Sequence, residues 1–180
     1  MTPDPALSRE DIQQLLTEVG AYLHVRGWTA TVYVAGGAAM SLLFDGRTTT
    51  RDIDAVFRSD RGQLEAAVRD VATRHGLPVD WLNDRVTRLV PSALDTGATE
   101  LVVPGLHVLV ASERHLLAMK MLAGRERDVP DLALLFRRLG VSTPAQAVAI
   151  TEDVFGDTYP VERPPVEYLE ALAADVLDVR

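Results

Sequence analysis

Two aspartates separated by one residue, Asp52 and Asp54, are the side chains of this sequence best suited to hold a cation. They lie in the stretch DIDAVF, whose β-branched and apolar residues predict a strand. Residues two apart in a strand face the same side, so both carboxylates project together while Ile53 points into the core. A rigid carboxylate pair suits Mg²⁺, which completes its shell with water and phosphate oxygens. The alternative is a solvated strand end or a turn.

Two glycines, Gly36 and Gly37, stand upstream, where the predicted strand TATVYVAG gives way to a helix. Glycine lets the backbone N–H groups at a helix N-terminus approach an anion closely, so this turn favours a phosphate. The alternative is tight packing of the helix on the sheet, because neither G-x-G-x-x-G nor a Walker A pattern is present. Basic and hydroxyl side chains directly before the acidic pair support the phosphate interpretation. They are Arg47, Thr48, Thr49, Thr50 and Arg51.

Lys120 is the only lysine among 18 basic residues. In the predicted helix ERHLLAMKMLAG it shares an apolar face with Leu116 and Leu117. An ammonium there is costly unless it binds an anion or reaches solvent along its aliphatic stem. The position therefore favours a functional lysine, with the solvent-reaching lysine as the alternative.

Three charged residues after Lys120 have structural interpretations of their own. Asp128 can cap the next helix, and Asp131 sits in the first turn, where a carboxylate favours the helix dipole. Arg125 can bind the carbonyl groups left open at the end of the preceding helix.

The elements that position these residues follow from periodicity and caps. An amphipathic helix is predicted over SREDIQQLLTEVGAYLHVRG, with Ser8 as N-cap, and a further helix ends at Gly76. Residues 77–98 lack a clean period and are interpreted as loop with a short helix or strand. TELVVPGLHVLVAS predicts a β-hairpin that extends the sheet.

Four helices are predicted after the hairpin, starting near Ser112, Asp128, Thr143 and Val166. The fold class expected is α/β (α+β). A core over residues 1–111 precedes a C-terminal helical region, residues 112–180, which is expected to pack on it in a single compact unit.

Composition narrows the classes of function. The 180 residues are 47% hydrophobic and contain no cysteine, which excludes disulfides and a thiol nucleophile. No apolar run approaches the roughly 18 residues needed to span a bilayer, and MTPDPALSRED lacks signal-peptide features, so a cytoplasmic protein without membrane contact is expected.

A net charge of −8 opposes broad binding to nucleic acid. Contact with RNA would need a local basic patch. Basic side chains after the hairpin can form one, and the alternative is that they lie on ordinary solvated helix faces. The candidates are Arg114, His115, Arg125, Arg127, Arg137 and Arg138.

The glycine pair followed by RTTTRDIDAVF resembles the signature of the polymerase-β-like nucleotidyltransferase superfamily. Within it, the sequence is most similar to the AbiEii-type nucleotidyltransferases of bacterial toxin–antitoxin systems, which include the MenT toxins. That group carries a later segment that LLAMKMLAGRERDVPDL resembles. The resemblance covers roughly residues 30 to 57 and 106 to 136, and it implies a polymerase-β-like core with a mixed sheet.

The resemblance also implies roles for individual residues. Asp52 and Asp54 would be catalytic metal ligands, Lys120 a substrate-phosphate contact and Asp131 a second active-site acid. The residues expected to bind the nucleotide, directly or in support, are Gly36, Gly37, Ser41, Arg47, Thr49, Arg51, Arg125 and Asp128.

The activity implied is transfer of a nucleoside monophosphate from a nucleoside triphosphate to an acceptor hydroxyl, with Mg²⁺ or Mn²⁺. RNA, at the tRNA 3′ end, is the first acceptor expected, with a cognate toxin or antitoxin as partner protein. The alternatives are nucleotidylation of a partner protein and a catalytically silent nucleotide-binding or interaction domain.

Two departures from the superfamily pattern stand out. Gly37 and Ala38 follow the first glycine, where many members have serine, so phosphate binding would rest on backbone amides and Ser41. A third carboxylate on a neighbouring strand has no clear counterpart. The candidates are Glu100, Asp80 and Asp84.

Overall fold

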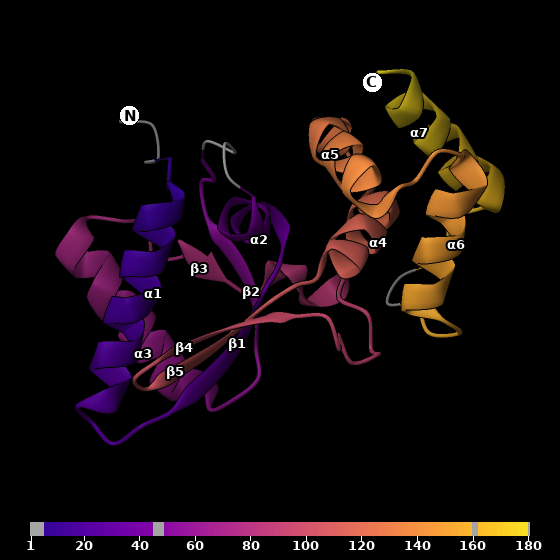
Figure 1. Cartoon of the computed structure of the whole chain (residues 1–180). Helices are drawn as coiled ribbons and strands as arrows, with labels where there is room; N and C mark the ends of the chain where they lie inside the picture. Colours follow the sequence, from indigo (N-terminus) through magenta and orange to yellow (C-terminus); the bar gives the residue numbers. More distant parts are fainter. Residues whose placement is uncertain (1–5, 45–48, 160–161, 180) are drawn as a thin grey trace. The chain divides into compact units, whose positions relative to one another are not determined.

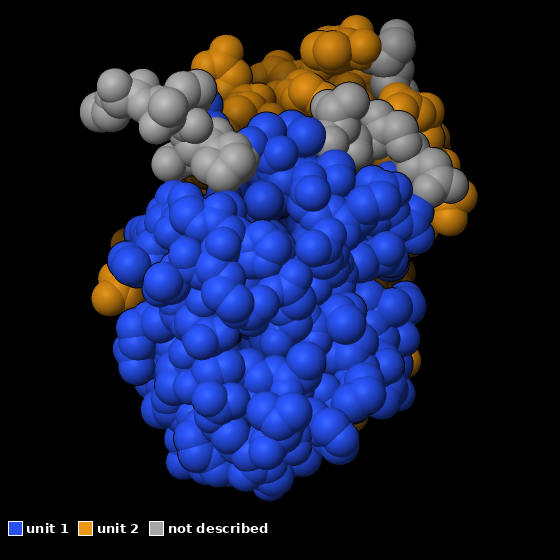
Figure 2. Space-filling view, turned by 90° about the vertical axis from the view of Figure 1, so that its left-hand side faces the viewer, with its two compact units in different colours: residues 1–87, 98–111 blue, residues 88–97, 112–180 orange. Residues whose placement is uncertain are grey.

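The computed structural model describes residues 6–44, 49–159 and 162–179 (Figure 1). The chain divides into two compact units, residues 1–87 with 98–111 and residues 88–97 with 112–180 (Figure 2). The described residues form seven α-helices and one mixed sheet of five strands, which lies in the first unit. The predicted α/β class is therefore confirmed.

The first unit alternates helices and strands and then forms a hairpin. Its helices are α1 (Arg9–His24), α2 (Gly36–Leu43) and α3 (Arg61–His75). Its strands are β1 (Ala30–Val34), β2 (Ile53–Phe57), β3 (Leu82–Asn83), β4 (Thr99–Val103) and β5 (Leu106–Val110). A 3-10 helix, η1 (Arg85–Arg88), follows β3, so the segment expected to hold a short helix or strand contains both.

The sheet has the order β3-β2-β1-β5-β4. The central strand β1 runs antiparallel to β2 and parallel to β5, and β2 runs parallel to β3. The antiparallel pair β4 and β5 is the predicted hairpin, and it turns at Gly105, whose φ is +82°. Because β5 pairs with β1, the hairpin extends the sheet as the sequence predicts.

Helix α1 begins with the predicted cap and packs its apolar face inward. Ser8 accepts from the N–H of Asp11, and the Asp11 side chain accepts from the N–H of Ser8. Gly20 lets the helix approach the hairpin, because a Cβ there would lie 2.6 Å from the carbonyl oxygen of Pro104. The buried apolar side chains of α1 recur at helical spacing on one face, as an amphipathic helix requires; they are Ile12, Leu15, Leu16, Val19 and Leu23.

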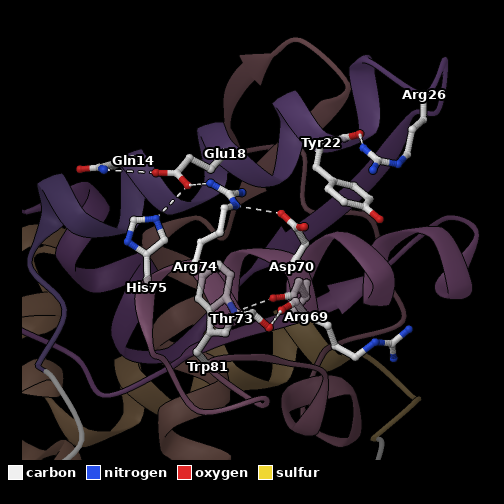
Figure 3. A network of polar contacts seen from close by, with 11 residues as sticks. Gln14, Glu18, Tyr22, Arg26, Arg69, Asp70, Thr73, Arg74, His75 and Trp81 are labelled. Atoms are coloured by element: carbon white, nitrogen blue, oxygen red, sulfur yellow. Dashed lines mark hydrogen bonds and ion pairs between the residues drawn. The ribbon is translucent and has the colours of Figure 1, made fainter.

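Polar contacts join α1 to α3 (Figure 3). The Glu18 carboxylate on α1 accepts from Arg74 and lies 2.8 Å from the ring of His75 on α3. Beneath α3, the indole N–H of buried Trp81 donates to the carbonyl of Val68 at 3.1 Å. These contacts fix α3 and the segment that leads into β3.

The second unit is helical. Its elements are α4 (Glu113–Ala123), η2 (Glu126–Asp128), α5 (Val129–Leu139), α6 (Pro144–Phe155) and α7 (Val166–Asp178). Helix α4 packs against the other three α-helices. Residues 88–97 belong to this unit because Asp95 accepts from the N–H of Ser112 at 2.8 Å and Ser92 bonds to Thr158 at 2.8 Å. Within the described ranges, no helix is both long enough and apolar enough to cross a lipid bilayer.

Candidate metal and phosphate site

The acidic pair lies at the start of β2. Asp52 directly precedes the strand and Asp54 is its second residue, with Ile53 fully buried between them. The side chain of Asp52 is 36% exposed, and Asp54 is also partly exposed. Asn83 pairs in register with Asp54, and its amide donates to Asp52 Oδ2 at 3.3 Å. Register partners on neighbouring strands point to the same face, so both carboxylates share one face of the sheet.

The glycine turn abuts this acidic pair. Gly36 opens α2 with a φ of +60°, a left-handed conformation that favours glycine. A Cβ on Gly36 would lie 2.9 Å from Asp54 Oδ2, so the turn and the carboxylate are in direct contact. A Cβ on Gly37 would lie 2.8 Å from Thr50 Oγ1, which itself donates to the carbonyl of Asp52 at 3.0 Å. A side chain at either position would therefore force Asp54 or Thr50 to shift, and at Gly36 the left-handed backbone also favours glycine.

The first turn of α2 presents backbone N–H groups next to the acids. The first amides of an α-helix have no partner within the helix and carry partial positive charge. The N-cap residue is Ala35, whose methyl side chain cannot accept from them. Its own N–H donates to the carbonyl of Asp54 at 2.9 Å, which ties the start of α2 to β2. An anion bound by this turn would therefore lie near the carboxylates.

Arg85, the first residue of η1, adds a positive charge beside the pair. Its Nη1 lies 3.9 Å from Asp52 Oδ2, and its guanidinium also binds Asp80. The side chain is 66% exposed. Neither Arg85 nor Asn83 was identified from the sequence, because both lie in a segment without periodicity and reach Asp52 only through strand pairing.

The other residues predicted to bind the nucleotide from this region fall into three groups. Thr49 and Arg51 are exposed in the segment before β2. Ser41 is fully buried and donates to the carbonyl of Gly37 at 3.1 Å, a placement that gives a phosphate-binding role no support. Arg47 lies outside the described residues.

No candidate for a third acid joins the pair. Glu100 lies on β4, which β1 and β5 separate from β2, and its carboxylate is 3.5 Å from His107. Asp80 and Asp84 each accept from an arginine, the second from Arg61 at 2.6 Å. In the part of the chain that the structure describes, no three Asp, Glu or His side chains are grouped to hold a metal ion.

Lys120 belongs to the second unit, where it is buried in an ion-pair cluster. Its Nζ lies 2.6 Å from Asp128 Oδ1 and 2.7 Å from Asp131 Oδ2, and the three side chains are 8%, 13% and 9% exposed. Lys120 therefore does not reach solvent along its stem. Asp128 occupies the N-cap position of α5, but its carboxylate binds Lys120 and makes no cap hydrogen bond. Arg125 is exposed at the start of η2.

The second unit contains a pair of buried side chains, His115 and Asp95, that the sequence did not predict. His115 on α4 has its Nδ1 3.3 Å from Asp95 Oδ1. Burial lowers the pKa of His115, while the neighbouring Asp95 carboxylate opposes this shift. This pair fastens residues 88–97 to α4.

The donor set around β2 fits a hard divalent cation. Two partly exposed carboxylates share a face beside a turn of backbone amides, and Mg²⁺ takes one or two protein carboxylates together with water and phosphate oxygens. Asp52 and Asp54 are the residues that would hold it. The amides at the start of α2 would bind the phosphates of the same ligand.

Comparison of the chain with models of protein families, with curated proteins and with solved structures finds no match in any of the three.

Proposed function

We propose that this chain is a Mg²⁺-dependent nucleotidyltransferase with a polymerase-β-like core, which moves a nucleoside monophosphate from a nucleoside triphosphate to an acceptor hydroxyl. One observation carries the proposal: the turn that opens α2 touches the Asp54 carboxylate, since a Cβ on Gly36 would lie 2.9 Å from Oδ2. Amides that suit phosphates and acids that suit a divalent cation therefore meet in the first unit, as nucleotide chemistry requires.

In the proposed reaction, the amides at the start of α2 and the exposed Arg51 bind the triphosphate. Asp52 and Asp54 would hold Mg²⁺ or Mn²⁺, which would supply stabilisation of the negative charge that develops on the reacting oxygens. The acceptor hydroxyl forms a bond to the α-phosphorus and gives its proton to water, while the bond to the β-phosphate breaks and pyrophosphate leaves. Positioning supplies most of the acceleration in such chemistry.

RNA, at the tRNA 3′ end, is the acceptor we propose, and a toxin–antitoxin system is the proposed setting. Both follow from the resemblance to AbiEii-type enzymes. In the second unit Arg125, Arg127 and Arg137 are exposed, whereas Arg114 and Arg138 are bound to acids. The roles of Lys120 and Asp131 in the reaction rest on the resemblance alone.

A label-transfer assay tests the proposal. The purified chain is incubated with Mg²⁺, bulk tRNA and each nucleoside triphosphate in turn, labelled at the α-phosphate. Label is expected on the RNA with at least one nucleotide. Label on protein instead would mean that the acceptor is a polypeptide, and no transfer to either would support the catalytically silent domain.

Single substitutions connect the transfer to the acidic pair. Asp52→Ala and Asp54→Ala are expected to reduce transfer at least 100-fold, about 3 kcal/mol of lost transition-state stabilisation. Asp70→Ala removes an exposed carboxylate of the same unit from α3, and this control should transfer label at the wild-type rate. Equal rates for all three variants would contradict a role of the acidic pair.

A further inference from the structure

Asn83 is the residue of β3 that faces the acidic pair. It is 8% exposed and ends the two-residue strand that runs parallel to β2. Because it pairs in register with Asp54 and bonds to Asp52, it lies next to both acids on one face of the sheet. It is also the only asparagine in the chain.

The hydrogen bonds of Asn83 determine how its amide is oriented. Its Oδ1 accepts from the backbone N–H of Arg85 at 3.0 Å, and its Nδ2 donates to the carbonyl of Asp80 at 3.3 Å. The flipped amide would place an NH₂ group against an N–H donor and an oxygen against a carbonyl oxygen. The Nδ2 group must therefore face Asp52, to whose Oδ2 it donates at 3.3 Å.

We infer that Asn83 is a positioning residue of the site, which orients the Asp52 carboxylate for the divalent cation; this inference rests on the proposed function. A carboxylate offers about four lone-pair sites, so one N–H donor leaves Asp52 capacity for a cation. A neutral amide at this place supplies orientation, and it adds no third negative charge beside Asp52 and Asp54. Hydrogen-bond partners that hold metal ligands in this way commonly contribute about 10- to 100-fold to metal affinity.

A purely structural role makes a different prediction. The bonds to Asp80 and Arg85 close a short loop, and a residue that served only this loop would contribute to stability. Its replacement would then lower the melting temperature and leave the affinity for a cation unchanged. Metal affinity therefore separates the two roles.

The single asparagine permits a direct measurement on the whole chain. Protein labelled with ¹⁵N at the asparagine side-chain amide gives one NH₂ pair, which needs no further assignment. Titration with Mg²⁺ is expected to shift this pair, and Mn²⁺ to broaden it. In Asp52→Ala both effects should disappear. A pair that stays unshifted at Mg²⁺ concentrations that saturate the wild-type protein would overturn the inference.

Two substitutions at Asn83 provide a second readout, the Mn²⁺ dissociation constant measured by electron paramagnetic resonance. Asn83→Ala is expected to weaken Mn²⁺ binding about 10- to 100-fold. Asn83→Asp places a carboxylate against Asp52, so its melting temperature should fall without metal and rise more than that of the wild type when Mn²⁺ is added. If Asn83→Ala does not fold, Asn83→Asp and the amide signal still decide the question.

The outcomes distinguish the inference from the proposed function. Wild-type protein that binds no Mn²⁺ would contradict both. Wild-type protein that binds Mn²⁺ through Asp52, with an unchanged dissociation constant in Asn83→Ala and an unchanged Mn²⁺ response in Asn83→Asp, would contradict the inference alone.

Discussion

Lys120 shows how burial changes what a single residue can do. Its ammonium is 2.6 Å from one carboxylate and 2.7 Å from another, so much of its charge is already neutralised within the second unit. Removal of one partner from a buried ion pair leaves uncompensated charge and costs about 3–5 kcal/mol. We therefore expect Lys120→Met to lower the free energy of unfolding by about this amount, measured by urea denaturation.

The control for this prediction is Arg137→Met on α5, an exposed arginine of the same unit. Exposed substitutions of this kind usually change stability by less than about 0.5 kcal/mol. If Lys120→Met were as stable as Arg137→Met, the ion-pair cluster would contribute little to the free energy of unfolding.

The sequence predicts the environment of some single residues correctly and gives no indication for others. Ile53 is buried as expected, because strand alternation alone places it. The binding partners of Lys120 were not predicted as a cluster, since the sequence indicated only that a buried ammonium needs an anion. Asn83 was missed because a two-residue strand has no periodicity and its bond to Asp52 joins residues 31 positions apart.

At the scale of elements, the turn from β1 into α2 is the most constrained feature of the site. Gly36 has a φ of +60°, and a Cβ there would approach Asp54 Oδ2 to 2.9 Å. The left-handed backbone alone costs a residue with a side chain about 1–2 kcal/mol. Gly36→Ala should therefore lower the free energy of unfolding by at least that amount and also weaken Mn²⁺ binding through displacement of Asp54.

Gly62→Ala on α3 is the matched glycine control. Its Cβ would meet only Asp60 Oδ1, at 3.4 Å, and alanine favours a helix over glycine by up to about 1 kcal/mol. This variant should be as stable as the wild type or more stable. A Gly36→Ala protein with wild-type stability and Mn²⁺ affinity would mean that the turn is not held as the structure shows.

Helices and the hairpin were predicted more accurately than the segment between them. Five apolar residues recur on one face of α1, and Pro104 with Gly105 separates two apolar runs, so local pattern determines both elements. Strand β3 has no such pattern. It forms because Leu82 and Asn83 pair with β2, a contact that depends on the folded unit.

At the scale of the whole molecule, the chain does not divide at one point. The sequence indicates a boundary between residues 111 and 112, yet residues 88–97 belong to the helical unit although they precede the hairpin. Asp95 and Ser92 hold this segment through bonds to Ser112 and Thr158. Hydrogen bonds between residues so far apart along the chain leave no periodic signal in the sequence.

The stability of the molecule should depend on pH through His115. Burial lowers its pKa below the usual 6.5, against the opposing charge of Asp95, so the folded state binds a proton less readily than the unfolded state. The contribution of His115 to the free energy of unfolding is therefore fully present above about pH 6.5. It is lost as the pH falls from there toward the lowered pKa of the folded state. The free energy of unfolding of wild-type protein should fall over this window more steeply than that of His115→Gln, by up to about 1.4 kcal/mol per pH unit.

His24→Gln serves as the control, because His24 is exposed at the end of α1. Its pH profile is measured alongside, so that an effect specific to His115 is separated from the general effect of removing an imidazole. Parallel profiles for wild type and His115→Gln would show that His115 does not titrate differently in the folded and unfolded states.

The central claim is that Asp52 and Asp54 hold a divalent cation beside the phosphate-binding turn. A crystal structure of the full chain with Mn²⁺ and a non-hydrolysable nucleoside triphosphate tests it most directly, because the anomalous signal of manganese locates the cation. We predict one peak within coordination distance of both carboxylates, with the triphosphate against the first turn of α2. A nucleotide bound elsewhere, or manganese bound away from both aspartates, would contradict the account.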